Sequence, residues 1–216
     1  MAQTANQKTV ATANATVVRI PTNKIEQVTL TVQGVGTGLL VHRFSETQVR
    51  EMEAPTLGEA QGVRGPRNYQ IEFEESRYVV DGKDVFPSAT IKKRLVDGCS
   101  FMDGIFKTTA RGAFFVLGEH VEILSDPPEL HKAVVKVGKG LNKTAMVRIR
   151  ALYRTPWKMR VPIRYDASII SLDQLVFLFV QTGFSIGFGD WRPQSSGSFG
   201  MFEVIGNGKG LANGRD

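Results

Sequence analysis

The sequence has little cysteine and few histidines, and both shortages restrict the chemistry open to the protein. Of its 216 residues, one is a cysteine, Cys99, and three are histidines. A single cysteine excludes an intrachain disulfide and any zinc site built from several cysteines. His42, His120 and His131 have no recognisable ligand spacing, so we expect no metal and no cofactor. A reducing, cytoplasmic environment is the natural expectation for such a chain.

Long apolar runs and common catalytic motifs are also missing. No stretch approaches the roughly 20 apolar residues that a membrane span needs. The N-terminal residues contain no continuous hydrophobic segment of the kind found in signal peptides. The motifs GxxxxGK[ST], GxSxG and HExxH do not occur. We therefore expect no membrane contact, and no activity that depends on those motifs.

Carboxylates are absent from one long stretch of the chain. Residues 131–165 contain ten Lys or Arg and no Asp or Glu, in a protein whose formal net charge is +6. A balance of this kind favours a polyanion as partner. An acidic protein is the alternative partner, and an interfacial membrane role is a weaker alternative because the stretch lacks hydrophobic anchors.

The basic residues within this stretch alternate with apolar ones. Alternation with period 2 predicts strands over 147–154 and 158–164, with Thr155 and Pro156 at the turn between them. Such a hairpin would present six cations on one sheet surface: Arg148, Arg150, Arg154, Lys158, Arg160 and Arg164. Nucleic-acid contact is one interpretation of this surface. The other is a solvated face balanced by acids elsewhere, such as Glu72, Glu74 and Glu75.

A glycine-rich segment with interleaved aromatic residues, 183–206, follows an apolar helical pattern. Glycine permits positive φ angles and close approach of another chain, while aromatic and arginine side chains offer flat faces for stacking. We predict a supple loop in which Trp191, Arg192 and Phe199 contact nucleic acid. The alternative is a glycine-rich hairpin with Trp191 packed down. Three further cations complete the predicted nucleic-acid-binding set: Lys92, Lys93 and Arg111.

The order of predicted elements indicates an α+β fold. We expect strand 25–33, helix 88–102, strand 113–124 (one strand, or two around Gly118), strand 158–165, helix 171–183 and strand 199–205. This order is a ferredoxin-like, RRM-like βαββαβ core, with insertions at 34–87 and 125–157. A single domain would then cover 24–205, between a flexible arm at 1–23 and a flexible tail at 206–216. RNA-recognition modules of this shape bind on the free face of the sheet.

The segment GFGDWRPQSSGSFGMFEV, between the second helix and the last strand, resembles the diagnostic loop of the RAMP superfamily of CRISPR proteins. It is most similar to that of the Cas7-like backbone subunits. The resemblance implies an RRM-like core with insertions that binds guide RNA without base specificity and polymerises along it. The segments LLVHRFSE, TTARGAFFV and GDWRP also resemble an uncharacterised group of phage-encoded proteins, which would place the protein in the host cytoplasm.

Three functions follow as hypotheses. The first is a non-catalytic protein that coats single-stranded DNA or RNA, with phosphates on the basic strands and bases on Trp191 or Phe199. The second is a structural protein that self-associates through the nearly all-apolar helix 171–183 and binds an acidic partner. The third, implied by the resemblance, is an endoribonuclease of the RAMP type with His42 or His131 as the base. We favour the first, as a homo-oligomer.

Overall fold

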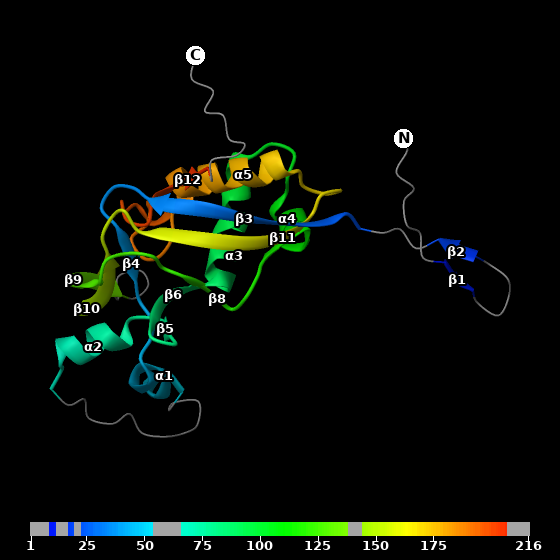
Figure 1. The fold of residues 1–216 in the computed structure, drawn as a ribbon. Helices are drawn as coiled ribbons and strands as arrows, with labels where there is room; N and C mark the ends of the chain where they lie inside the picture. Colours follow the sequence, from blue (N-terminus) through cyan, green and yellow to red (C-terminus); the bar gives the residue numbers. More distant parts are fainter. Residues whose placement is uncertain (1–8, 12–16, 20–22, 54–65, 138–143, 207–216) are drawn as a thin grey trace, which may run out of the picture.

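The chain folds as a mixed α+β protein with antiparallel sheets, as predicted (Figure 1). The structure is a computed structural model and describes residues 9–11, 17–19, 23–53, 66–137 and 144–206. Within these ranges the strands form four sheets, and every strand pair is antiparallel. No helix in the described ranges is long and apolar enough to cross a membrane.

The four-stranded sheet holds most of the core. Its strands, in spatial order, are β12 (Phe202–Ile205), β3 (Ile25–Gly34), β11 (Lys158–Asp166) and β7 (Phe114–Val116). β11 alternates strictly, because Met159, Val161 and Ile163 are fully buried while Arg160 and Arg164 are exposed. Successive side chains of a strand point to opposite faces, so this sheet has an apolar inner face and a polar outer face.

Two helices pack on the inner face. They are α3 (Ser88–Gly98) and α5 (Leu172–Gln181), and buried side chains such as Leu95 and Phe179 join the inner residues of β11 in one hydrophobic cluster. α5 begins with a capping box, in which Ser171 and Gln174 bond reciprocally to each other's backbone N–H. Figure 1 shows both helices on the same side of β3 and β11, leaving the other face of the sheet uncovered by them.

A second, three-stranded sheet stands beside the first. It has the order β4 (Leu39–Val41), β10 (Thr144–Tyr153) and β9 (Glu129–Val137). α2 (Tyr69–Glu75) packs near β10, and Arg67, just before this helix, donates a hydrogen bond from Nη1 to the carbonyl oxygen of Val147 at 3.0 Å. Ile149 to Tyr153 of β10 are buried on both faces of the strand.

The remaining elements are short. They are β1 (Thr9–Ala11), β2 (Val17–Arg19), α1 (Glu46–Glu53), a three-stranded sheet of β5 (Val79–Val80), β6 (Lys83–Pro87) and β8 (His120–Glu122), a 3-10 turn η1 (Cys99–Phe101), α4 (Lys107–Ala113), a π-helical turn η2 (Thr182–Ile186) and a 3-10 turn η3 (Pro193–Ser195). Cys99 is buried, and its burial raises the pKa of the thiol.

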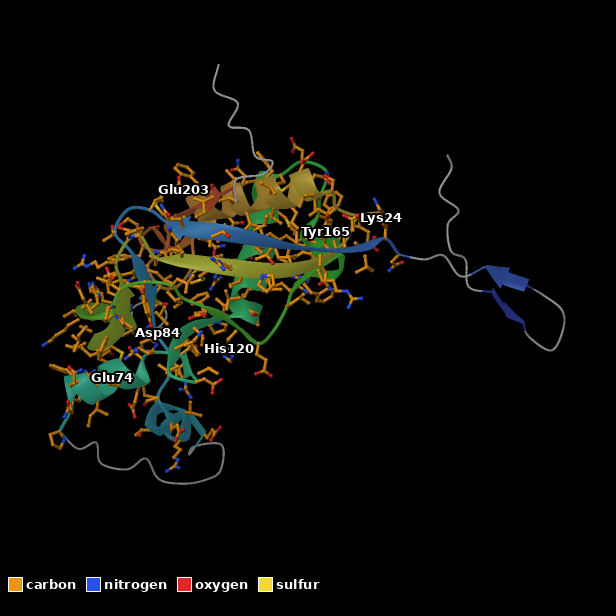
Figure 2. All side chains as sticks on the ribbon, viewed as in Figure 1. Lys24, Glu74, Asp84, His120, Tyr165 and Glu203 are labelled. Atoms are coloured by element: carbon orange, nitrogen blue, oxygen red, sulfur yellow. The ribbon has the colours of Figure 1, made fainter. Side chains whose placement is uncertain are left out.

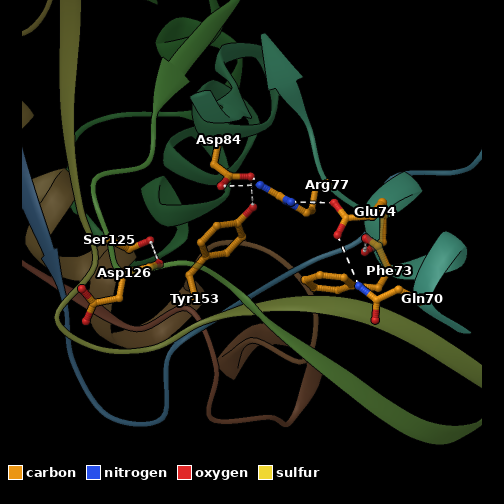
Figure 3. Close-up of polar contacts among 9 residues, drawn as sticks. Gln70, Phe73, Glu74, Arg77, Asp84, Ser125, Asp126 and Tyr153 are labelled. Carbon is orange, nitrogen blue, oxygen red and sulfur yellow. Dashed lines mark hydrogen bonds and ion pairs between the residues drawn. The ribbon is translucent and has the colours of Figure 1, made fainter. Parts of the chain in front are cut away.

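A polar network ties the three-stranded sheet of β10 to that of β6 (Figure 3). The hydroxyl of Tyr153 donates to Asp84 Oδ1 at 2.7 Å, and Arg77 Nε and Nη2 donate to the two Asp84 oxygens, each at 2.9 Å. Arg77 also donates to Glu74 at the end of α2. Burial, and then the hydrogen bond to Asp84, raise the pKa of Tyr153 well above its ordinary value, so the phenol stays a donor.

The predicted hairpin of 147–154 and 158–164 is wrong. Both segments are strands, but β10 and β11 belong to different sheets. The connection turns sharply inward, because Trp157 is fully buried and its carbonyl accepts from Gly34 N–H at 2.7 Å. The six cations are therefore divided between two surfaces.

Other boundaries also differ from those predicted. The segment 113–124 forms two strands, β7 and β8, in different sheets, and the two long helices end at Gly98 and Gln181 before short 3-10 and π turns. The segments predicted as insertions contain β4, α1, α2, β5 and β6 in the first and β9 and β10 in the second. Most of the predicted arm at 1–23 and tail at 206–216 lies outside the described residues.

Candidate nucleic-acid interface

The outer face of the four-stranded sheet carries a row of cations. Lys158, Arg160 and Arg164 occupy outward positions of β11, so they extend along one strand for about 20 Å at the usual rise per residue. Each lies opposite a polar residue of β3 that shares the same face: Gln33, Thr31 and Gln27. Cations and neutral hydrogen-bonding groups thus alternate across the two central strands.

Carboxylates are few on this face and lie at its margins. Among the described residues of the four strands, outward positions hold two, Asp166 and Glu203. Asp166 is buried at the end of β11, where it accepts a hydrogen bond from Ser168 N–H at 2.9 Å. Glu203 lies at the opposite end of the sheet from Lys24 and Tyr165 (Figure 2). The middle of the face is therefore positive.

An exposed aromatic ring completes the face on the edge strand. Phe115 of β7 lies directly opposite Arg164 and is 51% exposed. The ammonium of Lys92, reaching from α3, sits 3.6 Å from the centre of its ring, and burial lowers the pKa of that lysine. Phe115 was not among the residues predicted from the sequence. The signal was available, since Phe114 is inward on a strand and its neighbour must then point outward.

The glycine-rich segment is tightly packed where a supple loop was predicted. A Cβ on Gly189 would lie 2.1 Å from the carbonyl oxygen of Leu40, and one on Gly200 would lie 1.8 Å from that of Phe188. Both glycines have φ of +70°, which disfavours other residues. Phe188 is fully buried and stacks on Phe202 with centroids 4.4 Å apart. These glycines serve close packing of the loop against the sheets.

Arg150 holds this loop against the three-stranded sheet of β4, β10 and β9. Its side chain is 2% exposed, its Nε donates to Asp190 Oδ2 at 2.9 Å, and its guanidinium carbon lies 4.7 Å from the centre of the Trp191 ring. The indole face and the carboxylate offset part of the cost of burying this cation, although its buried Nη1 has no hydrogen-bond partner among the described residues. The prediction that Arg150 presents its charge on a surface is therefore wrong, because the loop covers the face of β10 on which it lies.

Trp191 and Phe199 are half-buried around His131. The His131 ring meets Trp191 and Phe199 edge-on, at centroid distances of 5.8 and 5.7 Å. His131 lies directly opposite Arg150 in the register of β9 and β10. The two aromatic residues predicted to stack with bases thus form the packing between the loop and β9, with the imidazole between them.

The other predicted cations are dispersed. Arg154 is exposed but pairs with Glu129 at 2.9 Å, and Arg148 is half-buried on the same face of β10 as Arg150. Arg192 donates to Gln194 and to the Gly189 carbonyl within its own loop. Lys93 and Arg111 are exposed on α3 and α4. The structure brings together Lys158, Arg160, Arg164 and, through Phe115, Lys92.

Two histidines share the loop-covered face of β10. Burial, and next the charge of Arg148, lower the pKa of His42, and burial followed by the charge of Arg150 lowers the pKa of His131. Both are therefore neutral near pH 7. Among the described residues, no three His, Cys, Asp or Glu side chains are grouped in a way that would hold a metal ion.

Comparisons with known proteins give structural similarities alone. No family model matches the sequence, and no curated protein does. A chain of the type III-B Cmr-beta bound to cognate target RNA is 12% identical, with a TM-score of 0.45 over 85% of this chain and 60% of that one. Cmr6 from Pyrococcus furiosus is also 12% identical, with a TM-score of 0.43 over 85% of this chain and 99% of its own. This chain spans about 60% of the length of the first of these two.

Proposed function

We propose that the protein is a non-catalytic module of the RAMP type that binds single-stranded nucleic acid on the outer face of its four-stranded sheet. The element order β3, α3, β7, β11, α5, β12 and the sheet order β12-β3-β11-β7 support a ferredoxin-like, RRM-like core. Modules with that core leave one sheet face free for a single strand. Both RNA and DNA are candidate ligands.

The observation that carries the proposal is the charge of this face. Arg160 and Arg164 are exposed on the central strand β11, and the described ion pairs include neither of them. Cations left without a protein counter-charge on a sheet surface suit a phosphate backbone, whose binding releases counterions. In this proposal a base stacks on Phe115, which lies opposite Arg164 and is exposed. Contacts to phosphates and to the flat face of a base do not depend on sequence, so they suit a protein that coats a single strand.

Fluorescence anisotropy with labelled oligonucleotides tests the proposal. We expect 20-nucleotide oligo(U) and oligo(dT) to bind at low salt and to weaken steeply as salt rises. Duplex DNA should bind more weakly, because stacking on Phe115 requires unpaired bases. If neither single strand binds at low salt, or if affinity does not change with salt, the proposal fails.

Replacement of Phe115 tests the stacking contact directly. Phe115→Ala should weaken oligo(U) binding by about ten-fold, within the roughly 1–3 kcal/mol that one stacked base contributes. Phe106→Ala is the matched control, because Phe106 is also an exposed phenylalanine but lies outside the sheet. Equal losses for both variants would contradict a specific role for Phe115.

The proposal also includes self-association through α5. Phe177, Val180 and Phe184 form an exposed apolar stripe on α5 and η2, in which Phe184 is 72% exposed. The sequence from 174 to 189 contains no charged residue, so two copies can meet there in spite of the net charge of +6. The occupant we propose for this stripe is a second copy of the chain.

Light scattering after size exclusion measures this association. The doubly substituted Phe177→Glu, Phe184→Glu protein should be monomeric at concentrations where the unsubstituted protein forms larger species. Phe106→Glu puts the same charge on an exposed phenylalanine at the start of α4, outside this stripe, and it should retain the assembly. A monomeric mass for the unsubstituted protein at all concentrations, with and without oligonucleotide, would exclude this part of the proposal.

Catalysis by the histidines is the competing hypothesis that the chain itself suggests. His42 and His131 both lie on the face of β10 that holds Arg150. In this hypothesis one of them acts as the acid and the other as the base, with Arg150 between them. His131, however, has a buried Nδ1 and is held between Trp191 and Phe199. We expect labelled RNA to remain intact after prolonged incubation. Cleavage that is lost in His42→Ala would replace the non-catalytic proposal with a ribonuclease.

A further inference from the structure

A small pocket lies between the glycine-rich loop, β6 and the first turns of α3. Its volume is about 170 Å³, which corresponds to the liquid volume of about five or six water molecules. That space suits one ring system. Tyr78 and Phe86 supply aromatic surface to its lining, and Thr90, Arg94, Asp190 and His42 supply polar groups.

The polar groups offer both donors and acceptors. Arg94 pairs with Asp97 through Nη1 at 3.3 Å, and its buried Nε–H has no hydrogen-bond partner among the described residues. Asp190 receives Arg150 Nε on Oδ2, and Oδ1 accepts no hydrogen bond within the described part of the chain. A buried donor without an acceptor is costly, so a ligand that supplies the acceptor is favoured.

The mixture of charges argues against a simple anion site. Asp190 lines the pocket and would repel a phosphate, whereas a neutral heterocycle can use the carboxylate and the guanidinium together. Guanine carries adjacent N–H donors on its Watson–Crick edge, suited to a carboxylate, and acceptors at O6 and N7, suited to arginine. Aromatic and apolar side chains commonly enclose a base turned out of a strand.

We infer that this pocket binds a guanine base, with Asp190 accepting from its N–H edge and Arg94 donating to its acceptor edge. Tyr78 and Phe86 contact the flat faces of the base, and the neutral His42 and the hydroxyl of Thr90 are within the same lining. The inference rests on the proposed function when the base belongs to a bound strand. A free guanine nucleotide would satisfy the same chemistry.

Two measurements separate these sources. In the first, a 20-nucleotide oligo(U) that contains one central guanosine is compared with oligo(U) of the same length. We expect the guanosine to increase affinity about ten-fold, the order of one well-formed base contact. In the second, GMP and UMP are titrated against the 15N-labelled protein, and amide shifts near Thr90 and Gly189 are followed.

Substitutions assign the preference to the pocket. Arg94→Met and Thr90→Val should each reduce the guanosine preference while oligo(U) affinity is retained. Arg50→Met is the matched control, because it removes an exposed cation of α1 that does not line the pocket, and it should keep the preference. Thermal unfolding checks that each variant is folded, and Thr90→Val keeps the test valid if Arg94→Met unfolds.

The outcomes distinguish this inference from the proposed function. Binding of GMP without binding of either oligonucleotide supports the pocket and contradicts the strand-binding proposal. Salt-dependent oligo(U) binding, with no guanosine preference and no GMP shifts, overturns the pocket and leaves the strand-binding proposal in place. A guanosine preference that is unchanged in both Arg94→Met and Thr90→Val also overturns the pocket.

Discussion

At the scale of single residues, glycine has two different uses in this chain. Gly34 and Gly112 both have ordinary backbone angles, but their surroundings differ. A Cβ on Gly34 would lie 2.1 Å from Nε1 of the buried Trp157, whereas a Cβ on Gly112 would meet nothing within 4 Å. The first glycine is required by packing at the turn before β11, and the second is an exposed helix residue that another side chain could replace.

The two Gly→Ala substitutions should therefore have opposite effects on stability. Gly34→Ala should lower the free energy of unfolding by about 1–3 kcal/mol, because the methyl group overpacks a core that holds a fully buried indole. Gly112→Ala in α4 should raise it by roughly 0.5–1 kcal/mol through helix propensity and reduced freedom of the unfolded chain. Urea unfolding measures both, and a neutral or stabilising Gly34→Ala would contradict the packing.

The ion pair of Arg150 and Asp190 should show an asymmetry between its partners. Asp190→Asn leaves a buried guanidinium without a counter-charge, which should cost about 3 kcal/mol or more. Arg150→Met should cost less, since Met fills similar volume and the Asp190 side chain, 36% exposed, is already reached by water. Urea unfolding of both variants at pH 7 checks the order. A larger loss for Arg150→Met would show that stacking on Trp191 dominates.

At the scale of elements, the alternation of apolar and basic residues correctly predicted which side chains share a face of a strand. It did not predict which other segments cover that face. β11 has the predicted alternation, and Arg160 and Arg164 are exposed on its outer face, whereas Lys158, bridged to Leu124, is half-buried. β10 has the same alternation, yet the glycine-rich loop covers the face that holds Arg150. The contact joins residues 40 positions apart, and a local pattern contains no information about it.

The helices and the main strands were predictable because their signals are local. Apolar spacing at helical period and the cap at Ser171 placed α5, and period-2 patterns placed β3 and β11. The division of β10 and β11 between two sheets was not predictable in this way. It depends on Trp157, whose burial against Gly34 turns the chain inward, and the sequence shows only a short linker there.

His42 and His131, which lie beside β10, should make the stability of the protein depend on pH. His42 faces Arg148, Arg150 and Asp190, and burial followed by the charge of Arg148 lowers its pKa below the unfolded value of about 6.5. The folded state then binds its proton less readily than the unfolded state. The associated stability is present above about pH 6.5 and is lost as the pH falls below that value.

Thermal unfolding at pH 7.5 and 5.5 measures this dependence. We expect a lower midpoint at pH 5.5, and a smaller decrease in His42→Gln, which cannot take up the proton. His131, whose pKa is lowered by burial and then by Arg150, should retain part of the decrease in that variant. Equal decreases in the unsubstituted protein and in His42→Gln would contradict the assignment.

At the scale of the whole molecule, the location of charge matters more than its total. The chain carries a net charge of +6, which favours weak contact with any polyanion. A dedicated interface should instead depend on particular cations. Arg160 and Arg164 lie on the outer face of the four-stranded sheet, whereas Arg43 and Arg50 are also exposed but lie outside that sheet, just before α1 and within it.

The salt dependence of binding separates these two possibilities. Each phosphate contact with a single strand contributes about 0.7 to the slope of log K against log salt. The double substitution Arg160→Ala, Arg164→Ala should therefore reduce the slope for oligo(U) by about 1.4, while Arg43→Ala, Arg50→Ala removes the same charge and should leave the slope nearly unchanged. Anisotropy titrations between 50 and 200 mM salt provide the slopes. If both double variants reduce the slope equally, net charge alone drives binding and the sheet face is not the interface.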